Sequence, residues 1–583
     1  MLYLILIPLL ISAILIPLLK ERKRLSWLVA LSATLVSFLL SIFFFILYFN
    51  KNVIESYNWF SFGGLSFSLS FIGNNLTIFM ALLVSFISIM VLLFAGAYIK
   101  KEKQARFYSE MSFFIFSMLG LVLSNSLLLF FIFWEFVGIT SYLLIGFWYD
   151  REGPAVSSKK ALLITRVGDL SFLTAIIIIF SSIKTFSIST LLVSIYSMPT
   201  TVIILTGSLF TIAALSKAAQ FPFYTWLIDA KEGPTPVSSL LHSATMVAAG
   251  AYLLVRLLPL ISAAGLQNLI VILGFVTAFI GALLGLRERH LKKILAYSTI
   301  ESLAFMFIAI GTLNAGGAIF YLFTHAVFKS MLFVISGALA LTFGTYDLYE
   351  LSKNKLGGIW LTIPSFIGFA SISAIPPFMS FFAHSALTYN FNIFENIAFI
   401  FVAFLTALFS FRAFFVIFRI KATKGIKKEF NLLFPIILLS IISTIGGIFL
   451  FFFKDIITIE YSFDIFSFIA LASTLFGVFV SYEFFYLKKG QSFVSKMNSL
   501  GSKLANYRYE KFIIAVGNAI SDLGFYFGKF DFMFSNAMSR AAESTFVLSS
   551  KTREIENGDS FRYITAVIIG LTVIILVAVV FVW

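Results

Sequence analysis

Runs of about twenty apolar residues recur from one end of this chain to the other. An α-helix needs roughly 20 residues to cross the hydrocarbon of a bilayer, where every backbone polar group must be paired inside the segment. Because 60% of the 583 residues are hydrophobic and only 12% are charged, with a mean hydropathy of +1.00, a water-soluble core is excluded. The sequence therefore predicts an all-α polytopic, multi-pass protein of the cell membrane.

The apolar runs predict about sixteen transmembrane crossings. They lie at 1–19, 26–48, 76–99, 109–124, 126–148, 160–181, 201–222, 236–258, 267–286, 293–311, 316–341, 359–382, 394–418, 431–453, 464–486 and 563–583. The first run resembles a signal peptide in length, but it lacks a basic start and is followed by the basic cluster 20–24, so we expect it to be retained.

Basic side chains gather in every second connecting loop, for example 20–24, 100–106 and 287–293. Cytoplasmic loops carry such an excess of Lys and Arg, so the odd-numbered crossings are predicted to end there and both termini to face outside. The net charge of +15 then reflects orientation in the lipid bilayer, and no nucleic-acid partner is implied.

The stretch 487–562 is too polar to span a membrane, yet its apolar residues recur at i+3 and i+4 from Phe512 to Ala541. This spacing predicts an amphipathic helix along the membrane surface, with a cytosolic helical subdomain as the alternative. The predicted organisation is N-terminal transmembrane helices at 1–106, a first transmembrane repeat at 107–258, a second at 259–420, further transmembrane helices at 421–486, the amphipathic region 487–562 and a final span at 563–583.

Four ionisable side chains lie inside otherwise apolar stretches, namely Glu135, Lys217, His325 and Lys329. A charge at the bilayer centre costs roughly 2.5 to 3.5 kcal/mol even on lenient insertion scales. A series of such residues is therefore typical of a route for ions or protons.

Two predicted crossings contain helix-breaking prolines. Pro222 follows Lys217 closely and cannot donate to the carbonyl four residues back, which predicts free backbone polar groups beside the lysine. Pro376 and Pro377 interrupt the crossing at 359–382. Breaks at corresponding places in two halves favour an inverted-repeat transporter with sites near the midplane, while kinks that serve packing alone are the alternative.

Lys217 suits proton transfer because burial disfavours the charged form of an amine, so that a desolvated lysine can exchange its proton near neutral pH. Glu135 is the natural partner, and a change in the distance between the two groups would switch whether Lys217 holds its proton. A static Glu135–Lys217 ion pair that only fixes helix packing is the structural alternative.

Tyr321, His325 and Lys329 have the spacing i, i+4 and i+8, which places them on one face of a helix. A hydroxyl, an imidazole and an amine in this order could pass a proton along, although a lone buried histidine is more often a structural group. The remaining candidates are a second row of Lys293, Tyr297 and Glu301, a local pair of Arg166 and Asp169, and the possible gates His242 and His384.

The chain contains no cysteine and only four scattered histidines. Disulfides, thiolate metal sites and iron–sulfur ligation are thereby excluded, and no metalloprotease-type histidine spacing occurs. The sequence predicts neither a cofactor-binding site nor a metal site in this chain.

At these positions the chain resembles the antiporter-like subunit L, also called subunit 5, of respiratory complex I, which is related to the large subunits of multisubunit cation/proton antiporters. The resemblance covers about 1–485. Its most specific stretches are 134–147, 165–169, 216–250, 295–299 and 324–329, including Trp-Glu-Phe-Val-Gly at 134–138 and Gly-Pro-Thr-Pro-Val-Ser at 233–238.

The resemblance implies that Glu135 and Lys217 form the coupling pair, with Asp169 as its modulator and His242 as a channel residue. It further implies that His325 and Lys329 form the central connection, and that Lys292 or Lys293 lies near the inner end of its helix. The implied function is proton translocation in an NADH:quinone oxidoreductase-type assembly, with quinone, flavin and iron–sulfur clusters in partner membrane and peripheral subunits. This chain alone would supply no electron transfer.

Three positions depart from the family pattern. Tyr321 stands where a histidine is frequent, His384 stands where a lysine is frequent, and Glu301 replaces a neutral amide and is expected to partner Lys293. Because imidazole titrates several units below an amine, His384 as the outer proton carrier predicts a different pH dependence of the exit step.

Other functions remain open from the sequence. The same residues would serve the large subunit of a sodium/proton antiporter, with Na⁺ as a possible transported ion, and a membrane-bound hydrogenase or a coenzyme-F420 dehydrogenase could contain the same subunit. A scaffold subunit with unused ionisable residues is the alternative from a different class.

Overall fold

The computed structural model describes residues 1–19, 23–62, 65–99, 103–353, 358–418, 429–449, 459–461 and 463–487. The predicted amphipathic region 487–562 lies outside these residues except for its first position, and the predicted final span 563–583 lies outside them entirely.

The described part is built almost entirely from helices. In the N-terminal part and the first half these are α1 (Ile7–Leu18), α2 (Lys23–Tyr48), α3 (Asn75–Tyr98), α4 (Gln104–Leu123), α5 (Leu127–Ile145), α6 (Glu152–Ile183), α7 (Ile188–Ser194), α8 (Thr200–Lys217), α9 (Thr225–Asp229), α10 (Thr235–Ser243), α11 (Met246–Arg256) and α12 (Leu258–Ala263). The second half contains α13 (Gln267–Arg287), α14 (Leu291–Gly311), α15 (Ala315–Phe343), α16 (Leu348–Lys353), α17 (Ile359–Ile372), α18 (Met379–Leu387), α19 (Ile393–Ile417), α20 (Phe430–Ile445) and α22 (Ile465–Ser481). Short helical turns occur at Leu2–Ile5, Ile195–Ser197, Ala230–Glu232, Gly446–Phe449 and Tyr482–Tyr486.

Thirteen helices in the described residues are long and apolar enough to cross a membrane. Each coincides with one of the sixteen predicted crossings, and most ends agree within a few residues. The predicted count is not confirmed, for three reasons. The helix Leu2–Leu18 is short, the crossing at 359–382 is broken into α17 and α18, and the last crossing is not described.

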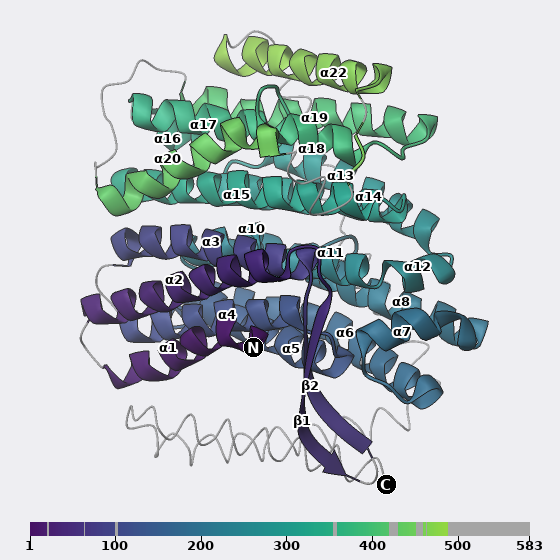
Figure 1. The fold of residues 1–583 in the computed structure, drawn as a ribbon. Coiled ribbons are helices and arrows are strands. Elements are labelled where there is room, and N and C mark those ends of the chain that lie inside the picture. Colours follow the sequence, from purple (N-terminus) through teal and green to yellow (C-terminus); the bar gives the residue numbers. More distant parts are fainter. Residues whose placement is uncertain are drawn as a thin grey trace, which may run out of the picture. The chain divides into compact units, whose positions relative to one another are not determined.

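The structure contains a β-hairpin that the periodicity analysis missed. Strands β1 (Val53–Phe62) and β2 (Leu65–Gly73) pair antiparallel, with Val53 opposite Gly73 and a register irregularity between Asn58 and Phe60. Figure 1 shows the hairpin running across the direction of the long helices, which lie side by side. Alternating polar and apolar residues such as those from Ser66 to Ser70 are the period-2 signal that could have revealed it.

The two halves of the helical part share the same local backbone features. A left-handed alanine lies in each helix break, Ala219 with φ 50° and Ala374 with φ 51°. A single bridge joins two loops in each half, Ser126 with Ser187 and His290 with Asp347.

Each half also contains a buried arginine at the C-terminal end of a helix. Arg256 donates to the carbonyls of Val122 in the last turn of α4 and of Ser124 just after it, and Arg412 donates to those of Gly285 and Glu288 at the end of α13. Such contacts satisfy helix-terminal carbonyls that have no partner inside the helix.

Candidate functional site

Lys217 is the last residue of α8 and is completely buried. Its Nζ lies 3.2 Å from Asp169 Oδ1 of α6 and 4.9 Å from the centre of the Trp134 ring of α5. The amine is thus enclosed by three helices and has a carboxylate partner, so it faces neither lipid nor bulk solvent.

Asp169 holds a central place in this group. Its Oδ1 accepts from Trp134 Nε1 at 2.7 Å as well as from Lys217, and its side chain is 3% exposed. Its Oδ2 has no hydrogen-bond partner in the described part of the chain but lies 3.8 Å from Arg166 Nη1. The local Arg166–Asp169 pair predicted from the sequence is therefore present.

Glu135 does not contact Lys217 directly, which corrects the expected pairing. Its carboxylate forms an ion pair with Arg166, and within the described helices no ion pair joins it to Lys217. It remains within electrostatic range of both Asp169 and Lys217. Two cations and two carboxylates consequently alternate along one chain of contacts, Glu135–Arg166–Asp169–Lys217.

Side chains bind two of the backbone carbonyls at the helix break after Lys217, where free polar groups were expected. Trp226 Nε1 donates to the carbonyl of Ser216 at 3.0 Å, and Gln220 Nε2 donates to that of Ala218 at 2.9 Å. Gln220 also reaches the carbonyl of Ile300 on α14 at 3.3 Å. Side chains therefore replace two of the helical hydrogen bonds and connect the break to the second half.

Tyr321, His325 and Lys329 all lie on α15 and are buried, as the spacing predicted. His325 lies beside the backbone of Ser243, where α10 ends, and within electrostatic range of His242 and Lys329. The His242 ring packs on Phe333 with centroids 4.7 Å apart, and its Nδ1 has no partner among the described residues. The structure thus brings His242 to the same central group.

Lys329 and Glu301 form the next contacts of this central group. Lys329 Nζ donates to Ser298 Oγ of α14, and Glu301 Oε1 accepts from Thr406 Oγ1 of α19 at 2.5 Å. Glu301 is 1% exposed and lies within electrostatic range of Lys329. The expected Glu301–Lys293 pair is wrong, because Lys293 lies in the first turn of α14 with its Nζ 3.7 Å from Glu288 Oε2.

His384 lies on α18 at the outer end of this series. Its ring centroid is 5.2 Å from that of Tyr321 and 5.2 Å from that of Phe399. Its Nε2 has no hydrogen-bond partner in the part of the chain that the structure describes.

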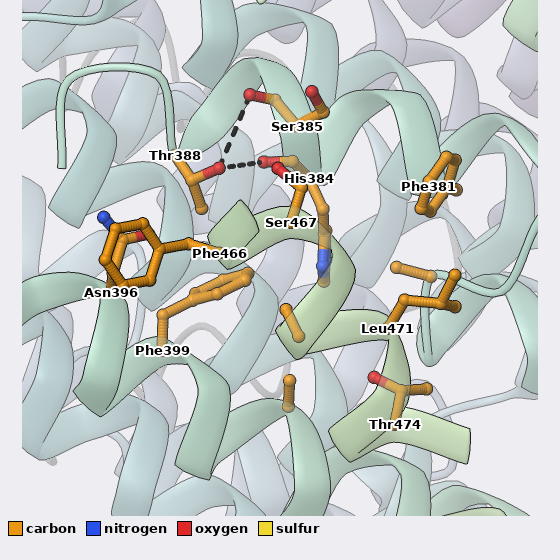
Figure 2. A pocket seen from close by; sticks show the side chains of 13 residues that line it. Phe381, His384, Ser385, Thr388, Asn396, Phe399, Phe466, Ser467, Leu471 and Thr474 are labelled. Atoms are coloured by element: carbon orange, nitrogen blue, oxygen red, sulfur yellow. Dashed lines mark hydrogen bonds between the residues drawn. The ribbon is translucent and has the colours of Figure 1, made fainter. Parts of the chain in front are cut away.

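A cavity with a water-accessible volume of about 30 Å³ lies beside His384. It has room for roughly two water molecules. Figure 2 shows the imidazole among the residues that line it, including Phe466, Leu471 and Thr474 of α22. Hydroxyl groups of Ser385, Thr388 and Ser467 and the amide of Asn396 belong to the same lining. The lining is mostly apolar, but these polar groups can hold water next to the imidazole.

The basic end of α14 carries Lys292 and, just before the helix, His290. Lys292 Nζ donates to the carbonyls of Lys231 and Gly233, at 2.5 and 2.8 Å, and therefore stabilises the turn that precedes α10. Burial, together with Lys231 and Lys292, lowers the pKa of His290 to about 4. His290 is consequently neutral at physiological pH.

Several contact residues were absent from the sequence-based set. These are Trp134, which contacts Asp169, Ser298, which contacts Lys329, and Thr406, which contacts Glu301. Trp134 directly precedes Glu135, and Ser298 lies three residues before Glu301, so helical adjacency was the available signal. Among the described residues, no group of three or more His, Asp and Glu side chains is arranged to hold a metal ion.

Known proteins match this chain in two ways at the sequence level. The model of the family described as NADH:quinone oxidoreductase/Mrp antiporter, TM, matches residues 124–410, and that described as NADH-Ubiquinone oxidoreductase (complex I), chain 5 N-terminus, matches residues 59–108. The chloroplastic NAD(P)H-quinone oxidoreductase subunit 5 of Pelargonium hortorum is 39% identical over 368 residues, which are 60% of this chain and 50% of the relative. The corresponding organellar chromatophore protein of Paulinella chromatophora is 37% identical over 383 residues, 62% of this chain and 58% of the relative.

Solved structures share the fold. A chain of the Mrp complex from Dietzia sp. has a TM-score of 0.72 at 23% identity, covering 90% of this chain and 62% of that one. A chain of the membrane-bound sulfane sulfur reductase, an archaeal respiratory membrane complex, has a TM-score of 0.73 at 20% identity, covering 82% and 99%.

These matches define the class of protein. The chain is a multi-pass membrane protein whose residues 124–410 belong to the NADH:quinone oxidoreductase/Mrp antiporter family, and its residues 59–108 match the N-terminus of complex I chain 5. It spans about half the length of the curated relatives that it matches.

Proposed function

We propose that this chain translocates protons in a membrane complex of the NADH:quinone oxidoreductase type, driven by electron transfer in partner subunits. The observation that carries the proposal is the fully buried Lys217 amine, 3.2 Å from Asp169 Oδ1 and electrostatically linked to Glu135. The quinone, flavin and iron–sulfur clusters of such a complex would belong to the partners, since this chain has no cysteine to ligate a cluster.

The working step is a change of partners along Glu135–Arg166–Asp169–Lys217. In the observed state each positive group has a negative neighbour. When the Lys217–Asp169 contact opens, and before the amine meets another carboxylate, a buried ammonium is left without a counter-ion, which is unfavourable, and release of its proton relieves that state. Arg166 can then form an ion pair with Asp169 in place of Lys217, because Arg166 Nη1 already lies 3.8 Å from Asp169 Oδ2.

Protons would then pass through the central group and leave near His384. His242, His325 and Lys329 lie within electrostatic range of one another. Glu301 and Tyr321 continue the series toward the cavity beside His384. Lys292 fits a supporting role here, because its amine is bound to two backbone carbonyls.

The test uses the intact complex in proteoliposomes, with electron transfer and proton uptake measured together. Lys217→Ala is expected to abolish coupled translocation while leaving assembly largely intact. Full coupling in a correctly assembled variant would reject the role of Lys217.

A second candidate is the large subunit of a sodium/proton antiporter, favoured by the fold shared with the Mrp complex over 90% of this chain. Isolation of the native complex separates the two, because companion subunits with flavin and iron–sulfur clusters are expected only for the redox-driven assembly. Exchange of Na⁺ for protons without any electron donor would instead support the antiporter.

A further inference from the structure

Three glycines surround the last turn of α8, and two of them serve helix packing. A Cβ on Gly168 of α6 would lie 2.6 Å from Ser216 Cβ, and one on Gly250 of α11 would lie 2.5 Å from the carbonyl oxygen of Ala214. Both distances are far below ordinary contact, so either substitution would displace a helix. These two glycines fix the backbone that carries Lys217.

Gly138 of α5 differs from both. A Cβ at this position would lie 3.0 Å from Lys217 Nζ, and no other heavy atom outside the surrounding helix turns would lie within 4 Å of it. The missing side chain at Gly138 therefore leaves space for the amine alone.

The position of Gly138 on α5 relates this space to the ion pairs. Trp134 and Glu135 precede it by four and three residues, so all three share one helix face. The amine lies 4.9 Å from the Trp134 ring and beside Gly138, and Glu135 is the next charged group on this face. Because packing fixes the end of α8, only side-chain rotation of Lys217 can carry the amine from Asp169 toward Glu135.

We propose that Gly138 is the positioning residue of the Lys217 switch, since it provides both the resting place of the amine and its path between Asp169 and Glu135. The proposal rests on the proton-translocating function of Lys217. A methyl group at position 138 would meet the amine at 3.0 Å, closer than the roughly 3.5 to 4 Å of favourable contact, and would displace it.

The main test is Gly138→Ala in the complete complex, with the ratio of protons translocated to electrons transferred as the readout. This ratio is expected to fall about tenfold or more, because a misplacement of 1 Å at a reacting group can reduce rates 10²-fold. Assembly should be retained, in contrast to Gly168→Ala, which should impair it.

Gly153→Ala is the matched control. Its added Cβ would also meet the end of a charged side chain, Glu232 Oε2 at 3.1 Å, but this carboxylate is 34% exposed and can move away. The control is expected to keep the normal ratio.

A second measurement separates positioning from packing. Gly138→Ala should lower the thermal unfolding temperature of the complex when Lys217 is present and should not lower it in a Lys217→Ala background, where the space for the methyl is free. Equal shifts in both backgrounds, loss of assembly, or a normal ratio in Gly138→Ala would overturn the proposal. If Lys217→Ala itself keeps full coupling, the proposed function fails; if only Gly138→Ala does, this inference alone fails.

Discussion

Replacement of Asp169 by asparagine isolates the charge of the central carboxylate. Asparagine has nearly the same shape and can still accept the hydrogen bond from Trp134 Nε1, which is 2.7 Å long in the native chain. The change therefore removes the negative charge next to Lys217 and little else. Both groups are buried, at 0% and 3% side-chain exposure, so water cannot replace the lost partner.

The size of the effect follows from two limits. Removing one partner of a buried ion pair destabilises by about 3 to 5 kcal/mol, because an uncompensated charge is left behind. The lysine can escape this state by losing its proton, which limits the loss. We therefore expect Asp169→Asn to destabilise by about 3 to 5 kcal/mol and to abolish coupled translocation.

The assay is a double-mutant cycle on the assembled complex, with thermal unfolding and coupled translocation measured for Asp169→Asn, Lys217→Met and the double variant. Because the double variant has no buried charge left at this site, it should be more stable than Asp169→Asn alone. Additive losses in the double variant would refute the reasoning, since they would mean that the two groups do not stabilise each other.

Three further predictions concern Glu301, His384 and His290. Glu301→Gln keeps an acceptor for Thr406 Oγ1 but removes a group that can exchange a proton near Lys329, so translocation should fall severalfold with assembly intact; an unchanged rate would exclude Glu301 from the route. His384→Ala should lower translocation, whereas His384→Lys should retain it with a pH profile moved to higher pH; identical profiles for the lysine variant and the native chain would argue against His384 as a carrier. His290 lies outside the membrane-spanning segments, and burial and the nearby Lys231 lower its pKa to about 4, below the ordinary 6.5. The unfolded chain therefore takes up this proton first, and stability is complete above about pH 6.5 and falls by on the order of 2 to 3 kcal/mol toward pH 4. His290→Gln should flatten this part of the stability curve, which denaturation between pH 4 and 7 would measure.

Most of the helical fold could be predicted because the bilayer imposes a local rule. A helix such as α14 satisfies its own backbone polar groups over about 20 residues, so its position can be predicted from a run of mostly apolar residues. The hairpin β1–β2 was not predicted, because its hydrogen bonds join two separate strands and are not determined within one continuous segment. The broken crossing α17–α18 was visible from Pro376 and Pro377, whereas the side chains that satisfy the other break were not.

The candidate site was predicted in part. Sequence spacing placed Tyr321, His325 and Lys329 on one helix face, and the structure agrees. Sequence could not choose the partner of Lys217, because Glu135 and Asp169 lie on different helices and the rotation of each helix about its axis decides which one it meets. The proton-carrying roles of these residues remain predictions.

The sequence by itself determined the membrane class, the approximate spans and the set of ionisable side chains inside them, because each depends on composition and spacing within one segment. Only the tertiary structure decided the Lys217–Asp169 and Glu301–Thr406 contacts, the open face of Gly138 and the cavity beside His384. These features arise where side chains of two or more helices meet, and their geometry depends on how the helices pack against one another.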